Sequence, residues 1–432
     1  MTCTNSRYCA CKVRHWSQWR LPLTAISDYN AGDTMKWRQF LTGALIAGIL
    51  PAILLLTAGT AGASPAPDPR NDPFYRQPTS FAGHTPGQIL KSRPVEVGLA
   101  GVPLPFAAYQ IQYVSTDTSG VRQAAVATLL KPLTASGSPK LVSYQPAIDS
   151  LSSRCDPSYQ LRSGTSLEVP QIAGLLNQGW TVVVPDFLGP DHQWGVGHVE
   201  GQSTLDGIRA AENFAPAKLE GRKTPVALTG YSGGARGTEI AYELAPAYAP
   251  ELNIVGAAAG GLGVDMEKIS RNANGGLFSG VVFAGLFGLD RAYPSMKMDT
   301  ILTDKGKELR RTLSGMCVFE YTAAYAFKRV QSYTVGGIDP LTVPAVRTAL
   351  AENKPGAFGT PKAPGYFYNA SADELVIPAD VDKLAARYCA KGVVVQSVTQ
   401  PGDHVSMLAT GYTGAVGWIA DRFADRPAPS TC

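Results

Sequence analysis

The segment that most constrains this chain is Gly230–Gly234, which reads Gly-Tyr-Ser-Gly-Gly. An apolar run, Val226–Thr229, comes before it, and Ala235–Leu244 follows with apolar residues at helical spacing. A G-x-S-x-G pattern between a strand and a helix is typical of a sharp turn that exposes its serine. Glycine is needed there because a side chain on either side would clash with the strand or the helix. We therefore predict that Ser232 is a nucleophile, placed where free N–H groups at the start of a helix face developing negative charge.

Strand-like and helical segments alternate along much of the chain. Apolar runs predict an opening hairpin and three further short strands: Phe106–Val114, Ala124–Leu130, Lys140–Tyr144, Thr181–Pro185 and Pro225–Thr229. Helical stretches such as Val169–Gln178 and Ser203–Phe214 lie between the runs. This alternation is typical of an α/β fold with a mostly parallel central sheet.

The strand pattern stops after Gly263. From about Asp265 to Val343 the sequence predicts helices with glycine-rich joints, and strands return at Gly365–Asn369 and Val393–Val398. We expect an α/β core of residues 64–264 and 346–432, interrupted by a helical cap of residues 265–345. The cap contains a 13-residue apolar stretch, Leu277–Leu289, which we interpret either as a buried helix or as a lid that lines an acyl chain.

The N-terminus has the features of a secretory signal. Lys36 and Arg38 precede an apolar run at residues 41–58, and the small residues Ala61-Gly62-Ala63 follow it. We interpret residues 35–63 as a signal peptide that is cleaved near Ala63, and residues 1–34 as a mis-called start or a disordered extension. The alternative is that residues 41–58 are retained as a membrane anchor.

The leader carries the excess of positive charge. Residues 1–63 hold six of the 38 Lys and Arg residues and two of the 34 Asp and Glu residues, which leaves 32 of each in the remainder. A net charge of zero weighs against nucleic-acid binding and against attraction to anionic membranes. With 45% hydrophobic and 17% charged residues, the chain has the composition of a folded protein.

The cysteines agree with export. Three of the seven lie in the leader, and the rest of the chain keeps four: Cys155, Cys317, Cys389 and Cys432. An even number in a secreted chain suggests two disulfides, for which three connectivities are open. The leader cysteines Cys3, Cys9 and Cys11 have no further ligands at metal-site spacing. We therefore expect no metal and no cofactor.

A nucleophilic serine needs a base. After the leader there are four histidines: His84, His192, His198 and His404. In chains with this serine turn, the acid and then the histidine follow the serine, and only His404 follows Ser232. It lies in a loop directly after the predicted strand Val393–Val398, so we predict that His404 is the base. The loop that carries His192 and His198 is interpreted as structural, with a substrate-lining role as the alternative.

The acid should follow a strand between the serine and the histidine. Asp373 fits, because it comes in a turn after the predicted strand Gly365–Asn369. A carboxylate there would hold the imidazole tautomer and stabilise its cation. Glu374 is the next candidate. Three other carboxylates fit less well, since two fall on the following helix and one adjoins the histidine: Asp380, Asp382 and Asp403.

Several short motifs, in this order and spacing, give the chain a wider likeness. They are Tyr144–Asp149, Val183–Pro190, Leu205–Ala210, Gly230–Gly234, Ala372–Pro378 and Gly402–His404. On these motifs the sequence resembles the secretory lipase family typified by Candida antarctica lipase A, and the likeness covers most of the chain after the leader.

The resemblance implies an α/β-hydrolase fold with an inserted helical cap or lid. It implies Ser232, Asp373 and His404 as a catalytic triad, and an oxyanion hole made by the backbone N–H groups of Asp149 and Gly233. It also implies two disulfides, Cys155–Cys317 and Cys389–Cys432.

We therefore expect a secreted serine lipase or esterase that hydrolyses carboxylic esters, with triacylglycerols as the expected substrates, through an acyl-enzyme on Ser232. The expected partners are a lipid or other ester and a lipid–water interface, with no nucleic acid and no protein partner. The alternatives that remain open are an acyltransferase or a peptidase on the same triad, a short-chain esterase on that triad, and a catalytically silent hydrolase fold that acts as a binding module.

Overall fold

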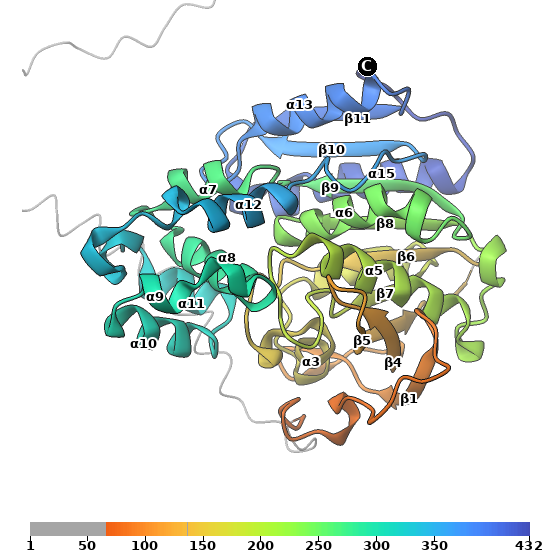
Figure 1. Cartoon of the computed structure of the whole chain (residues 1–432). Helices are drawn as coiled ribbons and strands as arrows, with labels where there is room; N and C mark the ends of the chain where they lie inside the picture. Colours follow the sequence, from red (N-terminus) through yellow and green to blue (C-terminus); the bar gives the residue numbers. More distant parts are fainter. Residues whose placement is uncertain (1–65, 136) are drawn as a thin grey trace, which may run out of the picture. The chain divides into compact units, whose positions relative to one another are not determined.

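A nine-stranded, mostly parallel sheet forms the centre of the molecule (Figure 1). The computed structural model describes residues 66–135 and 137–432. The predicted leader, both its signal peptide and its anchor alternative, therefore lies outside the described residues. In spatial order, the strands are β1 (Ile89–Val95), β4 (Ala107–Thr116), β5 (Arg122–Lys131), β7 (Thr181–Pro185), β6 (Leu141–Gln145), β8 (Val226–Tyr231), β9 (Ile254–Gly260), β10 (Gly365–Ala370) and β11 (Val395–Gln400).

The strands from β7 to β11 are parallel, whereas β1, β4 and β5 pair antiparallel at one edge. A separate two-stranded ribbon joins β2 (Gly98–Leu99) and β3 (Val102–Pro103). In β6, β7 and β8 every residue is buried, as expected for parallel strands that are covered on both faces. The α/β-hydrolase fold is confirmed.

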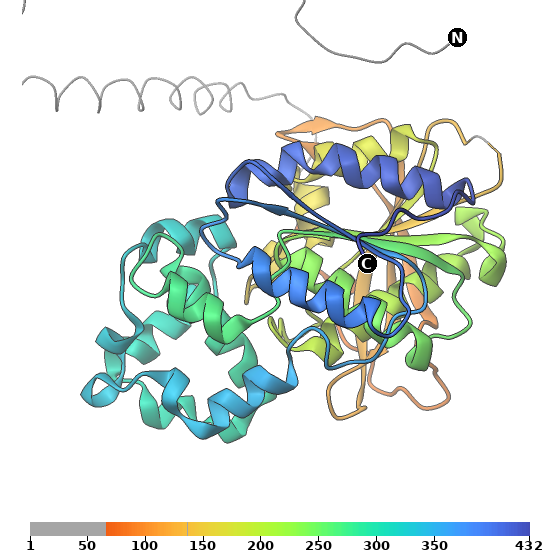
Figure 2. The same cartoon turned by 90° about the horizontal axis from the view of Figure 1, so that it is seen from above.

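Helices cover both faces of the sheet (Figure 2). Helices α5 (Gly197–Glu212), α6 (Gly233–Tyr248) and α13 (Pro378–Cys389) pack on one face. The other face is covered by α3 (Pro157–Ser163), α4 (Val169–Asn177) and α15 (Tyr412–Phe423). A short helix, α14 (His404–Thr410), begins at the candidate catalytic histidine.

Between β9 and β10 the chain forms helices, with one isolated β-bridge between Leu302 and Thr334, and these helices lie beside the sheet (Figure 1). They are α7 (Met266–Ala273), α8 (Ser279–Ala292), α9 (Met298–Ile301), α10 (Asp304–Leu313), α11 (Val318–Tyr325) and α12 (Pro344–Glu352), with short 3-10 turns between them. We call Met266–Glu352 the cap. The expected boundary at residue 345 falls inside α12, and the division into core, cap and core stays a proposal.

The apolar stretch Leu277–Leu289 forms most of α8, and its residues 279–289 are buried. Its simpler interpretation as a buried helix is therefore correct. The hydrophobic cluster around α8 extends into the core, where it includes Ile148, Leu151, Leu375 and Val376. The interior of the cap is thus continuous with two loops of the α/β core.

Two strands of the sheet were not expected from the sequence. Strand β9 reads Ile-Val-Gly-Ala-Ala-Ala-Gly, and alanine and glycine have little intrinsic strand preference. Strand β1 lies at the sheet edge and contains Pro94, which lacks the N–H that a central strand would need. Both strands form because neighbouring strands offer them partners.

Two disulfides are present, Cys155–Cys317 and Cys389–Cys432. The first joins the loop after β6 to the cap, and the second joins the end of α13 to the C-terminal residue. In the part of the chain that the structure describes, no helix is long and apolar enough to cross a membrane.

Candidate active site

Ser232 lies at the turn between β8 and α6, with φ 54° and ψ −121°. This is a strained backbone conformation for a residue with a side chain. The turn is tight because its glycines lie directly against the neighbouring strand. A Cβ atom on Gly234 would stand 1.9 Å from the carbonyl oxygen of Gln145, and one on Gly230 would stand 2.6 Å from it. The predicted strand–turn–helix is therefore present, and it presents Ser232 at the start of α6.

The three residues predicted as a triad meet at the carboxyl ends of the parallel strands. Ser232 Oγ lies 2.8 Å from His404 Nε2, and His404 Nδ1 lies 2.8 Å from Asp373 Oδ2. The Asp373 side chain is fully buried, and His404 is nearly so. This geometry allows the imidazole to accept the serine proton while the carboxylate fixes its tautomer.

Hydrogen bonds that involve backbone groups hold both Asp373 and His404 in place. The second oxygen of Asp373 accepts hydrogen bonds from the N–H groups of Leu375 and Val376. The rival acid, Glu374, accepts a bond from the backbone N–H of His404 at 2.9 Å. On the other side, the hydroxyl of Tyr231 donates to the His404 carbonyl at 2.6 Å.

The other rival acids lie elsewhere. Asp380 and Asp382 are on α13, as expected, and Asp403 caps the start of α14. The support that Tyr231 and Glu374 give to His404 was not foreseen from the sequence. Their position beside Ser232 and Asp373 in the chain was the only signal.

The predicted oxyanion residues lie next to each other. Asp149 has a positive φ of 42°, in the loop between β6 and the turn Ser153–Cys155. Its carboxyl group rests on Gly233, since a Cβ on Gly233 would stand 1.6 Å from Asp149 Oδ1. Among the described residues, neither the N–H of Asp149 nor that of Gly233 has an acceptor. Both are therefore free to donate to a substrate oxygen.

The side chain of Asp149 is an unusual neighbour for an anion. It is buried, and burial raises its pKa to about 7, helped by the nearby carboxylate of Glu200. Its Oδ1 atom has no hydrogen-bond partner among the described residues. Below about pH 7 the group is therefore neutral, which spares the site a negative charge beside Ser232.

A buried ion pair supports the nucleophile helix. Arg236, one turn after Ser232, lies 3.0 Å from Glu200 on α5, and both side chains are buried. Arg236 also donates to the carbonyls of Gly195 and Asn353. The pair thus ties α6 to α5, to the loop before α5 and to the end of α12. No short motif marks such a pair in a sequence.

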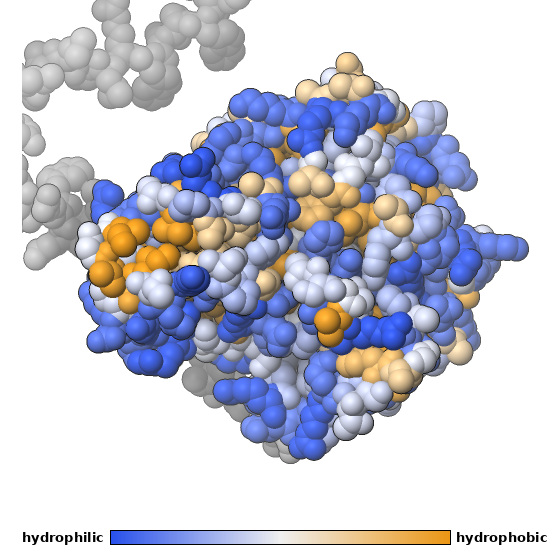
Figure 3. All heavy atoms as spheres, in the orientation of Figure 1, coloured by the Kyte–Doolittle hydropathy of each residue, from blue (hydrophilic) through white to orange (hydrophobic). Residues whose placement is uncertain are grey.

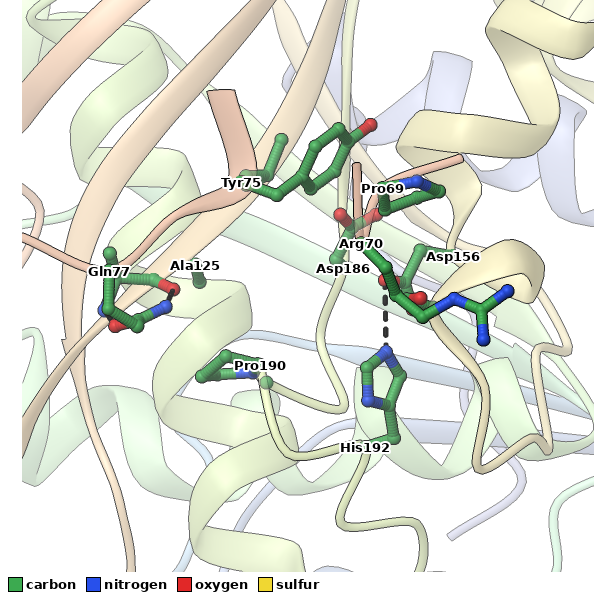
Figure 4. Close-up of a pocket in the computed structure, with 13 residues that line it drawn as sticks. Pro69, Arg70, Tyr75, Gln77, Ala125, Asp156, Asp186, Pro190 and His192 are labelled. Carbon is green, nitrogen blue, oxygen red and sulfur yellow. Dashed lines mark hydrogen bonds and ion pairs between the residues drawn. The ribbon is translucent and has the colours of Figure 1, made fainter. Parts of the chain in front are cut away.

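The two other histidines that the sequence suggested for the region do not touch Ser232. Figure 4 shows His192 pointing toward the buried Asp156, at 3.1 Å, in a cavity of about 220 Å³ that contains none of the triad residues. His198 packs edge to face on Phe358. Within residues 66–135 and 137–432, no group of three or more His, Cys, Asp or Glu residues could hold a metal ion.

Comparison with known proteins agrees with this geometry. The sequence profile described as secretory lipase matches residues 157–431. The chain belongs to the secretory lipase family. Its relatives in this family are named as lipases and esterases. Their names support the expectation that this chain hydrolyses carboxylic esters.

Three relatives show how close the likeness is. A probable inactive lipase of Mycobacterium tuberculosis is 35% identical over 376 residues, which is 83% of each chain. Lipase A of Moesziomyces aphidis is 32% identical over 402 residues, covering 85% of this chain and 86% of the relative. The crystal structure of Candida antarctica lipase A in its closed state has a TM-score of 0.79 and 32% identity, covering 85% and 89%.

In this member of the secretory lipase family, the cavity at Ser232 is small. Its volume is about 30 Å³, close to that of one water molecule. The lining is mostly apolar and comes from both core and cap: Asp149, Trp194, Ser232, Gly233, Arg236, Gly263, Met266, Ile269, Val281, Leu375 and Val376. Ser232 and Gly233 are partly exposed, but this cavity is too small to hold an ester, so side chains of the cap or the loops must move for one to bind in it.

Proposed function

We propose that this protein is a secreted serine lipase that hydrolyses water-insoluble carboxylic esters, triacylglycerols among them, through an acyl-enzyme on Ser232. The hydrogen-bonded chain from Ser232 through His404 to Asp373 carries the proposal, because both of its contacts have the geometry that proton transfer requires. Membership of the secretory lipase family supports both the ester chemistry and export.

The proposed mechanism uses only side chains and backbone of this chain. His404 takes the proton of Ser232 as the hydroxyl attacks the ester carbonyl, and Asp373 stabilises the imidazolium. The N–H groups of Asp149 and Gly233 donate to the oxyanion. His404 then gives its proton to the leaving alcohol, and water attacks the acyl-enzyme by the same route to release the acid and restore Ser232.

An apolar surface beside His404 favours insoluble esters. The ring of Phe278 lies 6.4 Å from that of His404, and the neighbouring Val405 is 58% exposed. Leu277 and Phe327 are also exposed, and the N–H of Phe327 bonds to the carbonyl immediately before Leu277. Figure 3 shows that further hydrophobic side chains gather over the cap. Such patches on a protein surface are typical of contact with lipids or other apolar partners.

One observation favours a second candidate, a catalytically silent binding module. The relative from Mycobacterium tuberculosis, which is similar over most of its length, is named as a probable inactive lipase. Against this alternative stands the intact Ser232–His404–Asp373 chain of hydrogen bonds in the present protein.

The test is ester hydrolysis by the purified protein and by Ser232→Ala, on emulsified triacylglycerol and on soluble short-chain and long-chain esters. Ser119→Ala, in the exposed turn between β4 and β5, is the matched control. We expect turnover by the wild type and the control and none by Ser232→Ala. A folded wild type that is no faster than Ser232→Ala on every ester would overturn the proposal and favour the binding module.

A further inference from the structure

The backbone at Asp149, the oxyanion residue, is held by groups from outside its own loop. Asp149 has a positive φ, which costs energy for a residue with a side chain, so another part of the protein must hold it in place. Two residues before it, Ala147 is fixed by a bond from its N–H to the buried carboxylate of Glu168. For residues 149–151 the anchors come from a different part of the chain.

Three consecutive residues of the loop are bonded to the cap. The carbonyl of Asp149 accepts a hydrogen bond from the hydroxyl of Tyr321 on α11. The hydroxyl of Ser150 donates to the carbonyl of Met316 at 2.8 Å. The carbonyl of Leu151 accepts a bond from Arg291 on α8 at 3.0 Å. Among the described residues, these are the hydrogen bonds that tie residues 149–151 to the protein beyond their own loop.

Tyr321 is itself held firmly. Its side chain is completely buried, and burial raises its pKa well above the ordinary value, so the hydroxyl keeps its proton and remains a donor. Its backbone lies against Gly280 of α8, where a Cβ would stand 2.5 Å from the Tyr321 carbonyl oxygen. The disulfide between Cys155 and Cys317 joins the loop after β6, which carries Asp149, to the cap just before α11. The cap therefore offers Asp149 a rigid support.

We infer that Tyr321 is a positioning residue for the reaction: from the cap, its hydroxyl holds the carbonyl of Asp149 and so fixes the backbone at this residue, such that the Asp149 N–H, on the preceding peptide unit, points at the oxyanion. The inference rests on the proposed function. The cap then has a part in catalysis that is separate from covering the substrate, because an oxyanion donor must be pre-oriented to favour the transition state over the bound ester.

Tyr321→Phe removes the hydroxyl and leaves the ring. We expect kcat on a soluble ester to fall about 10-fold with KM nearly unchanged, a smaller loss than the ~10²–10³-fold cost of deleting an oxyanion donor. The matched control is Tyr325→Phe, one turn further along α11, whose hydroxyl makes no hydrogen bond among the described residues. It should keep the wild-type kcat.

Amide hydrogen exchange gives a readout that does not depend on turnover. In Tyr321→Phe, exchange should become faster in the peptide that contains residues 146–152, whereas Tyr325→Phe should leave it unchanged. Wild-type kcat together with wild-type exchange in Tyr321→Phe would overturn the inference. A loss of thermal stability alone, with kcat retained, would do the same, since it would show a purely structural role.

Two further measurements keep the test decisive. If Tyr321→Phe does not fold, Ser150→Ala removes the neighbouring anchor to Met316, and it should lower kcat in the same direction by a smaller factor. Ser232→Ala sets the background in every assay. A wild type that does not exceed this background overturns the proposed function itself, which is a different result from a normal wild type with an unaffected Tyr321→Phe.

Discussion

Ser232 and Asp149 lie side by side at the candidate site, and both have a positive φ, yet they are held in different ways. Ser232 is fixed by its own motif, in which Gly230 and Gly234 pack against the adjacent strand β6. Asp149 is fixed by side chains and backbone of the cap, which follow it by more than a hundred residues in the chain. The nucleophile is thus positioned locally, whereas the oxyanion residue is positioned at long range.

The largest expected effect is at Asp373, whose carboxylate is held locally by the N–H groups of Leu375 and Val376. Asp373→Asn should lower kcat by about 10⁴-fold with little change in fold, because the imidazole then adopts the wrong tautomer. Steady-state hydrolysis of a soluble ester and circular dichroism check this. Asp382→Asn, on the exposed side of α13, is the control and should keep wild-type kcat. Equal rates for wild type and Asp373→Asn would remove Asp373 from the triad.

The next effect tests the tight turn itself. Gly234→Ala places a methyl group against the Gln145 carbonyl, so the elbow must shift. A shift of this kind should reduce kcat by about 10²-fold and lower the melting temperature. Gly417→Ala, within α15, meets no atom within 4 Å and should be neutral or slightly stabilising. Wild-type activity in Gly234→Ala would show that the elbow is less constrained than its contacts indicate.

Removing each disulfide in turn distinguishes the support that the cap gives to the oxyanion loop from the general stability of the fold. Replacing Cys155 and Cys317 with serine opens a loop of 162 residues, and replacing Cys389 and Cys432 opens one of 43. The chain-entropy cost is about 5 and about 4 kcal/mol, respectively. Only the first pair joins the oxyanion loop to the cap, so only that variant should also lose kcat, by about 10-fold.

Thermal unfolding and kinetics at a temperature where both disulfide variants are folded provide the measurement. The same loss of kcat in both variants would show that the cap link has no special effect on the site.

The smallest expected effect is on pH dependence. Burial raises the pKa of Asp149 to about 7, so its charge appears beside the oxyanion as the pH rises through that value. Wild-type kcat should therefore decline a few-fold above about pH 7, and Asp149→Asn should not show the decline. The raised pKa also means that the stability contributed by this group is complete below about pH 4 and is lost as the pH rises to about 7.

Kinetic and denaturation profiles between pH 4 and 9 test both statements. Glu212→Gln is a suitable control. Its carboxyl also has a pKa raised to about 7 by burial, but it lies at the last residue of α5, away from the start of α6. It should change the stability profile and leave the kcat profile as in the wild type. A decline that persists in Asp149→Asn belongs to another group.

The contrast between Ser232 and Asp149 also explains what a single sequence can predict. The turn at Ser232, the strand Thr181–Pro185 and the helix starting at Val169 follow from local patterns, and the structure has them as predicted. The order of serine, acid and histidine then directed attention to His404, which indeed lies in hydrogen-bond contact with Ser232. Local patterns were sufficient wherever residues near in sequence determine the geometry.

Other features depend on distant partners and could not be predicted in this way. Strand β9 consists largely of alanine and glycine and is a strand only because β8 and β10 flank it. The Arg236–Glu200 pair and the bond from Tyr321 to Asp149 join segments 36 and 172 residues apart. No pattern within one segment indicates such a pairing.

The bond between Cys155 and Cys317 can form only after the chain has been made through residue 317. A growing chain completes β8, Ser232 and α6 well before it contains Met316, Cys317 or Tyr321. Since N-terminal parts fold first as they emerge, the elbow can form while the oxyanion loop still lacks its support. Asp373 and His404 also follow the cap in the chain, so under the proposed function the triad can be complete only after the cap has been synthesised.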